Sequence, residues 1–256
     1  MTPRAPSRRL GHTIHRLGAV ASTQGEAAAL AACGASEGTV VTATHQSAGR
    51  GRRGREWLDT PGESLLMSIV LRPRIAPNLA PQLSLVAAVA VVDALATAGV
   101  TTTIRWPNDV MVGERKICGM LPEAVTARRG TLDHVILGVG LNVNQRDFPA
   151  SIRTLATSVR IETGRGHAVE QMLHAILAGL DGWYSHFVDG GLDTLLPAWL
   201  ERAQGIGRHA RAADGREGVA VGLAADGALL LQTDSGETVR VVAGEVTTEV
   251  EHAAGH

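Results

Sequence analysis

The sequence of 256 residues is poor in cysteine, lysine and aromatic side chains, and it has almost no net charge. Its two cysteines, Cys33 and Cys118, are too few and too far apart for a disulfide scaffold or a CxxC site. A formal net charge of −1 argues against a nucleic-acid-binding protein, which normally has a basic excess. We find no signal peptide and no apolar run of about 18 residues. These absences favour a cytoplasmic protein that binds neither DNA nor a membrane.

Lysine is the rarest of the charged residues. Of the 24 lysines and arginines, all but Lys116 are arginine. A coding bias toward arginine can remove lysine from a solvated surface at little cost, because either cation serves there. We therefore expect Lys116 where a compact ammonium contacts a phosphate or a carboxylate as a point charge. For Lys116 taken alone, the alternative is that the lysine was retained by chance.

The remaining sequence predicts alternating strands and helices. Extended patterns indicate strands at residues 12–20, 38–44, 63–72, 101–106, 116–125 and 133–143. Helical patterns cover residues 23–33, 81–99, 169–188 and 192–203. Ser22 or Thr23 is expected to cap the first helix, with Glu26 completing a capping box on Thr23. The predicted strand at residues 133–143 contains a continuous apolar run with two glycines, which favours a central strand that another group approaches closely.

The chain changes character after Gln204. Residues 208–248 alternate over short strands separated by Asp-Gly and Ser-Gly turns, which predicts a small five-stranded barrel or sandwich. Residues 1–10 hold three arginines and two prolines with little to bury, and are expected to form a flexible tail. The sequence therefore predicts a catalytic domain at 11–204 and a second domain at 205–251.

An Arg–Gly loop, residues 48–55, separates two predicted strands. Glycines leave backbone amides free to surround an anion, and the arginines supply forked donors for phosphate or carboxylate. Four guanidinium groups repel one another, so we expect the loop to be mobile and to order when an anion binds. Trp57, shortly after, could stack on a base or cover an apolar ligand. A solvated linker or an RNA-binding segment remains an alternative.

Two further segments carry polar groups beside predicted strand ends. In Arg105-Trp-Pro-Asn-Asp109, Asp109 could bind a metal ion or accept a proton, although Pro-Asn-Asp is also ordinary turn chemistry. Gly138-Val-Gly-Leu-Asn142 ends in an amide that could contact a ribose or a phosphate. No P-loop, HExxH or GxSxG motif is present. The residues alone therefore indicate an enzyme that closes a loop over an anionic ligand.

Four motifs in register resemble those of the bacterial biotin protein ligases. They are Gly49-Arg-Gly-Arg-Arg-Gly-Arg55, the RWPND segment, Glu114-Arg-Lys-Ile-Cys-Gly-Met-Leu121 and Gly138-Val-Gly-Leu-Asn-Val-Asn144. The resemblance implies an α+β catalytic domain, with a mixed sheet flanked by helices, and a small C-terminal SH3-like β-barrel. Some members of the family carry an N-terminal DNA-binding domain, but only about ten residues precede the first predicted strand here, so we expect the monofunctional type without repressor activity. Two departures are Gln24, where the family usually has Asn, and Arg105, where it usually has Lys.

The resemblance implies a two-step reaction with ATP and biotin as substrates and Mg²⁺ accompanying ATP. Biotin is activated to biotinyl-5′-AMP and then transferred to a lysine of the biotin carboxyl carrier domain of an acyl-CoA carboxylase, the enzyme being a monomer or weak homodimer. Catalytic roles carry over to Lys116, Arg52 and Asp109. Biotin contacts carry over to Ser22, Thr23, Gln24, Gln46, Arg50, Gly51, Arg52, Lys116 and Gly119. Nucleotide contacts carry over to Arg50, Arg52, Arg55, Trp57, Asn108, Lys116 and Asn142, and no protein ligand to a metal is implied.

Two rival functions stay open at this point. A lipoate or octanoate ligase-like acyltransferase of the same superfamily would lack the GRGRRGR loop. A non-enzymatic RNA-binding module would combine a basic loop with a small barrel, but the near-zero net charge and the single tyrosine count against it. Pyrophosphate release that requires biotin separates the three.

Overall fold

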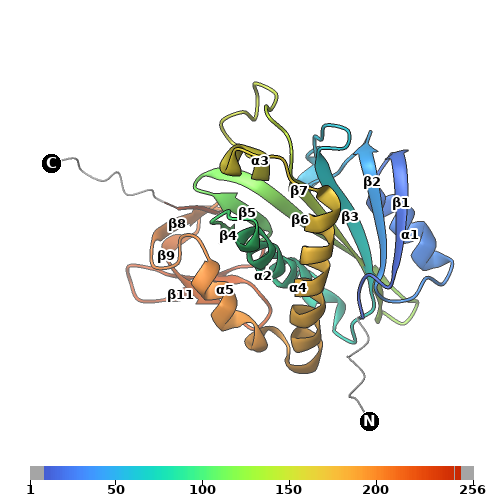
Figure 1. Cartoon of the computed structure of the whole chain (residues 1–256). Coiled ribbons are helices and arrows are strands. Elements are labelled where there is room, and N and C mark those ends of the chain that lie inside the picture. The colour runs from blue at the N-terminus through green and yellow to red at the C-terminus, as the bar shows by residue number, and fades with distance from the viewer. Residues whose placement is uncertain (1–8, 245, 249–256) are drawn as a thin grey trace, which may run out of the picture.

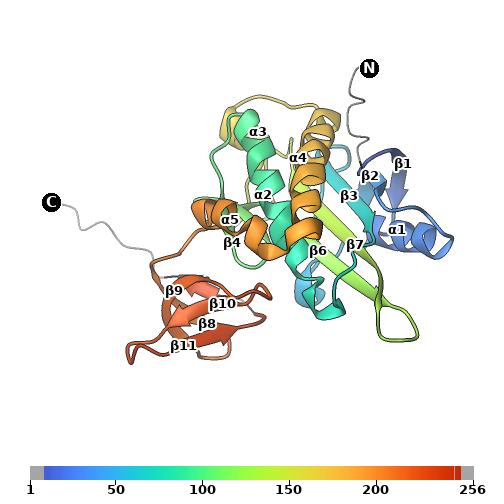
Figure 2. The ribbon, with the colours of Figure 1, turned by 90° about the horizontal axis from the view of Figure 1, so that it is seen from below.

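A computed structural model describes residues 9–244 and 246–248 of the chain. A seven-stranded mixed sheet with helices against it is followed by a five-stranded antiparallel sheet (Figure 1, Figure 2). The predicted α+β architecture with a small SH3-like C-terminal domain is confirmed. The predicted tail at residues 1–8 and the predicted domain end at 249–251 lie outside the described residues. Leu10 was wrongly assigned to the tail, since it is buried and its backbone N–H donates to Asp181 Oδ1 at 2.8 Å.

The first sheet consists of β1 (Thr13–Val20), β2 (Thr39–Gln46), β3 (Ser64–Leu71), β4 (Thr103–Arg105), β5 (Asp109–Val112), β6 (Arg115–Thr126) and β7 (Leu132–Asn142). The helices are α1 (Thr23–Ala32), α2 (Gln82–Thr97), α3 (Val159–Thr163), α4 (Val169–Gly190) and α5 (Leu196–Arg202), with 3-10 turns η1 (Arg52–Gly54), η2 (Pro77–Leu79) and η3 (Leu192–Thr194). The second sheet consists of β8 (His209–Ala212), β9 (Glu217–Leu223), β10 (Leu229–Gln232), β11 (Thr238–Val241) and β12 (Val246–Thr248).

Strand β7 occupies the middle of the first sheet, whose order is β1-β2-β3-β7-β6-β5-β4. Only β1 and β2 are parallel, joined through α1, and the other neighbours are antiparallel. This position explains the unbroken apolar run of β7, because a central strand covered on both faces has no solvated side. The expectation of a central strand is confirmed.

Helices cover both faces of the sheet, and the period of two along the strands shows which helix meets which face. Val40, Ile69 and Val135 belong to the large core with α2 and α4, whereas Val41, Val70 and Ile136 belong to a small core with α1. Helix α1 packs onto its face through Ala27 and Ala31, whose short side chains allow close approach. Figure 1 shows α2 and α4 side by side on the opposite face.

Helix α2 lies at the centre of the large core. The helical segment Pro77–Thr97 is long and apolar enough to cross a membrane by length and composition, with a mean hydropathy of 1.9. The statement that the sequence holds no such run was therefore wrong. In the structure 78% of the most apolar 18-residue stretch of this segment is buried inside the protein, as is usual for a core helix. Burial between the sheet and α4 accounts for its apolar character on every side.

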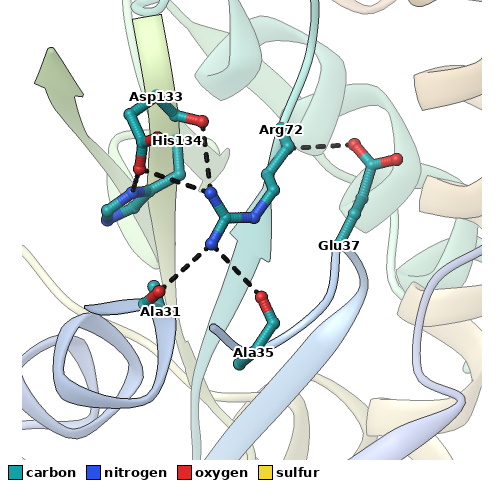
Figure 3. A network of polar contacts seen from close by, with 6 residues as sticks. All are labelled: Ala31, Ala35, Glu37, Arg72, Asp133 and His134. Atoms are coloured by element: carbon teal, nitrogen blue, oxygen red, sulfur yellow. Dashed lines mark hydrogen bonds and ion pairs between the residues drawn. The ribbon is translucent and has the colours of Figure 1, made fainter. Parts of the chain in front are cut away.

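Arg72, at the end of β3, fixes the C-terminus of α1 (Figure 3). Its guanidinium donates to the carbonyl oxygens of Ala31 and Ala35 at 3.1 and 3.2 Å, and lies 3.3 Å from the carboxylate of Asp133. A cation at this position satisfies carbonyls that a helix end leaves without partners. Glu37 accepts the backbone N–H of Arg72 at 2.9 Å. The far end of α1 is thus anchored to the sheet, which in turn sets the position of its N-terminus.

Three local expectations differ from the structure. The N-cap of α1 is Ser22, whose hydroxyl accepts from the backbone N–H of Gln24, so the capping box between Thr23 and Glu26 is wrong. Thr23 lies within the helix because its hydroxyl has other partners, described below. Strand β5 and helix α3 were not expected, since the four residues of β5 and the five of α3 are too short to show a period.

Candidate functional site

A pocket of about 270 Å³ opens where the N-terminus of α1, the Arg–Gly loop, β6, β7 and the turn after β4 meet. Of the residues predicted to form the site, the pocket is lined by Thr23, Gln24, Gln46, Arg50, Gly51, Arg52, Arg55, Trp57, Asn108, Asp109, Lys116 and Gly119. Ser22 and Asn142 are not among its lining residues. Side chains from segments almost a hundred residues apart in the sequence are therefore brought to one cavity.

One end of the pocket is a set of neutral polar groups. The carboxamide oxygen of Gln46 accepts from the backbone N–H of Thr23 at 2.8 Å and from its hydroxyl at 3.0 Å. The Thr23 hydroxyl is also 2.8 Å from that of Ser68, a buried residue of β3. Gln24 donates to the carbonyl of Leu121 at 3.1 Å. Neutral donors and acceptors held this rigidly suit an uncharged polar ligand group such as a urea or an amide.

Gln46 is held in turn by a residue that the sequence did not reveal. Asp59 has a fully buried side chain, and its Oδ1 accepts the backbone N–H of Gln46 at 3.2 Å. Its Oδ2 lies 2.9 Å from Nδ1 of His45. A buried carboxylate with two partners fixes the end of β2 where the loop begins. No spacing signal marks this role, because the two segments meet only when the loop folds back.

The Arg–Gly loop folds back on itself and lies against the sheet. Backbone bonds join Gly51 to Arg55 at 2.7 Å and Trp57 to Gly49 at 3.0 Å. The Arg50 guanidinium donates to the carboxylate of Glu123 on β6 at 2.9 Å. The loop therefore contains the short turn η1 and two cross-loop contacts. The mobility of the loop stays a prediction.

Trp57 lies flat on the glycines of the sheet. A Cβ at Gly140 would be 2.6 Å from Cε2 of the indole, and one at Gly119 would be 3.2 Å from Cζ3. This is the close approach that the glycines of β7 were expected to allow, and that prediction is confirmed. The buried Nε1–H of Trp57 has no hydrogen-bond partner within the described residues. An unpaired buried donor in a pocket wall is suited to a ligand acceptor.

Lys116 lies beside Trp57 and next to a carboxylate. Its Nζ is 2.6 Å from Oδ1 of Asp109 and 5.6 Å from the centroid of the Trp57 ring. The other carboxylate oxygen of Asp109 accepts from Arg105 at 3.2 Å. Asp109 thus lies between two cations, and its side chain is only 19% exposed. The sole lysine of the sequence lies in the pocket and contacts a carboxylate, one of the two kinds of group expected for it.

Cys118, two residues after Lys116, is not arranged as a nucleophile. Its side chain is completely buried, and burial raises the pKa of the thiol well above its usual range. A thiol in this state is unreactive.

The two predicted asparagines have different surroundings. Asn108 donates to the carbonyl of Met120 at 2.7 Å and accepts from Arg52 at 3.1 Å, so it connects the turn after β4 to the Arg–Gly loop. Asn142 is buried and donates to the carbonyl of Thr157 at 2.9 Å. The backbone around Thr157 pairs with that of Lys116. Asn142 therefore supports the strand of Lys116, and its contact with the nucleotide stays a prediction.

The pocket also includes residues of the second domain. Val246 and Thr247 of β12, together with Gly244 before it, line the same cavity as Trp106 and Pro107. No pattern in the sequence indicates this contact, because alternation predicts a strand but not the domain against which it lies. No group of three or more His, Cys, Asp or Glu side chains that could hold a metal ion occurs at residues 9–244 and 246–248.

Comparison with known proteins identifies relatives over both domains. Residues 22–142 match the biotin/lipoate A/B protein ligase family, and residues 205–247 match the biotin protein ligase C-terminal domain. The chain is 39% identical over 223 residues to the bifunctional ligase/repressor BirA of Bacillus spizizenii, covering 85% of this chain and 68% of that protein. It is 36% identical over 234 residues to the biotin–[acetyl-CoA-carboxylase] ligase of Paracoccus denitrificans, covering 88% and 96%. A solved structure of the biotin protein ligase from Aquifex aeolicus in complex with biotin and ATP superposes with a TM-score of 0.79 at 28% identity, covering 93% and 99%.

Proposed function

The chain belongs to the biotin/lipoate A/B protein ligase family, and we propose that the pocket activates biotin with ATP and passes it to a lysine of a carboxylase carrier domain. The protein is an ATP-dependent biotin protein ligase, with biotin and ATP as its substrates. The observation that supports the site assignment best is the position of Lys116. Its ammonium lies beside Asp109 and Trp57, in the same cavity as the arginines of the loop and the polar groups of Thr23 and Gln46.

The first step joins two anions, the biotin carboxylate and the α-phosphate of ATP, with loss of pyrophosphate. Its barrier is lowered mainly by neutralising and aligning these charges. We assign the neutral end of the pocket, around Thr23, Gln24 and Gln46, to the biotin head group. Lys116 and Arg52 then contact the carboxylate and the phosphate that react. Trp57 covers the nucleotide, and the folded loop keeps water from the mixed anhydride.

The second step needs a neutral amine from the incoming lysine. Asp109 is the carboxylate of the pocket nearest to Lys116, and we assign it the role of orienting that amine and accepting its proton. Arg105, in place of the lysine usual in the family, donates to Asp109 and keeps the carboxylate in position. Mg²⁺ is expected to enter with the phosphates of ATP. We place the reaction in the cytoplasm, with the carrier domain as partner and neither DNA nor membrane involved.

Pyrophosphate release from ATP that depends on biotin tests this function. Lys116→Ala and Arg52→Ala should each lower its rate by about 100-fold or more, the usual effect of removing one donor to a developing charge. Lys116→Arg should not restore it, since the lysine side chain lies so close to Gly119 that an added Cβ there would be 2.8 Å from its Nζ. Arg128→Ala, in the exposed turn after β6, is the matched control. Octanoate in place of biotin should be inactive, and wild-type rates in either alanine variant would contradict the assignments.

A further inference from the structure

The hairpin between β9 and β10 touches the catalytic domain at the N-terminus of α2. Gly227, in the turn of this hairpin, has a φ of +86°, and a Cβ there would be 3.2 Å from Leu85 and 3.3 Å from Gln82. The Gln82 side chain is buried and donates to the carbonyl of Ala225 at 2.7 Å. The tip of the hairpin, residues 225–227, is thus closely packed on α2.

Trp106 holds the same hairpin tip from the side of the pocket. Its Nε1–H donates to the carbonyl of Gly227 at 3.0 Å, and the residue is only 7% exposed. Ser84, in the first turn of α2, donates to the carbonyl of Pro107 at 3.2 Å. The beginning of α2 therefore connects the hairpin tip to the turn that precedes Asn108 and Asp109.

The position of the hairpin decides where β12 lies. Strand β12 pairs with β8, which pairs with β9, so the second domain moves as one sheet. Val246 and Thr247 from this sheet, with Gly244 just before β12, line the pocket together with Trp106 and Pro107. In contrast, the hydrogen-bond partners described for Thr23, Gln24 and Gln46 all belong to the catalytic domain. The second domain consequently forms a wall on the side of the Arg105–Asp109 turn.

We propose that the hairpin tip at residues 225–227 is a docking element, and that Gln82 and Trp106 are positioning residues that hold β12 as a wall of the pocket. The inference rests on the proposed function, because the wall matters only for the reaction that the pocket performs. A shift of the hairpin tip moves the wall away from the reacting groups without disturbing the neutral end of the pocket. It should weaken the ATP-dependent step and leave biotin binding unchanged.

The second domain provides a matched pair of variants. Gly227 and Gly236 occupy equivalent turns, with φ of +86° and +83°, and each donates its N–H three residues back, to Ala224 and Thr233. A Cβ at Gly236 would meet nothing within 4 Å, whereas at Gly227 it would meet α2. Asparagine is tolerated in the left-handed region. Gly227→Asn and Gly236→Asn should therefore differ mainly in docking.

A second variant perturbs the same contact from the catalytic domain. Gln82→Met keeps the length of the side chain and removes the donor to Ala225, and Gln82 is not a lining residue of the pocket. Each variant is compared with the wild type for biotin affinity without ATP, for KM and kcat of biotin-dependent pyrophosphate release, and for thermal unfolding. Gly236→Asn reports the effect of the turn alone.

The proposal expects Gly227→Asn and Gln82→Met to lower kcat/KM for ATP by about tenfold or more, since misplacing a positioning group by about 1 Å can cost 100-fold. Biotin affinity should equal that of the wild type, and Gly236→Asn should keep both properties. If Gly227→Asn behaves like Gly236→Asn, or if biotin affinity falls in parallel with the ATP step, the docking role is refuted. A wild-type protein without biotin-dependent pyrophosphate release would instead refute the proposed function.

Discussion

Gly140 allows a sharp test of how the pocket is built, because Trp57 lies directly on it. In Gly140→Ala the added Cβ would be 2.6 Å from Cε2 and 2.8 Å from Cζ2 of the indole. Ordinary contacts of a Cβ begin near 3.4 Å, so the indole must retreat by 0.8 Å, the difference between 3.4 and 2.6. Strand β7 lies in the middle of the sheet and cannot move away. The displacement therefore falls on Trp57 and the loop that carries it.

The size of the effect follows from the cost of overpacking. Inserting a methyl group into a well-packed contact typically costs about 1–3 kcal/mol. The same cost, applied to the position in which Trp57 lies on Gly140, lowers the equilibrium constant for closing the loop by about 5- to 150-fold. If Trp57 covers the nucleotide, the KM for ATP should rise by a similar factor.

Biotin-dependent pyrophosphate release, measured against ATP concentration, reports this change. Gly18→Ala is the control, since Gly18 is also a strand glycine and a Cβ there meets nothing within 4 Å. It should retain the KM of the wild type. A Gly140→Ala enzyme with the same KM for ATP as Gly18→Ala would show that Trp57 does not cover the nucleotide.

Three further predictions concern other parts of the molecule. Asp109→Asn should slow transfer to the carrier lysine by about 100-fold, with a smaller effect on pyrophosphate release. Single-turnover assays measure both steps separately, and a wild-type rate of transfer in this variant would show that Asp109 has no role in that step. Tyr184 donates to Glu37 at 2.6 Å, so Tyr184→Phe should lose about 1.5–3 kcal/mol of stability in urea unfolding. Burial raises the pKa of Tyr184, so wild-type stability should decline as pH rises above about 10, and this component should be absent in the variant. An enzyme that holds a lysine-acylating anhydride can label its own exposed lysines, so a near-absence of lysine would limit self-labelling. On this hypothesis Arg128→Lys should create a self-biotinylated residue detectable by mass spectrometry, whereas no label would leave coding bias as the explanation for the missing lysines.

The sequence predicts the structure best where a local pattern has one physical meaning. The glycines of β7 predicted close approach, and Trp57 fills that space. The lone lysine predicted a polar site, and Lys116 lies in the pocket beside Asp109. The motif order predicted the family, which the relatives bear out. Such signals depend on backbone geometry and residue chemistry that neighbours in the chain already determine.

Long-range contacts were decided only by the tertiary structure. The amide of Asn142 donates to the carbonyl of Thr157, a partner 15 residues away that the strand pattern does not indicate, and its contact with the nucleotide stays a prediction. Asp59 acquires its role only when the loop folds back onto β2. The sequence around Gly227 predicts only an ordinary hairpin turn, whereas in the structure its carbonyl accepts from Trp106, 121 residues earlier in the chain. The sequence by itself determined the elements and the chemistry they carry, whereas packing between distant segments selected which of these groups share one pocket.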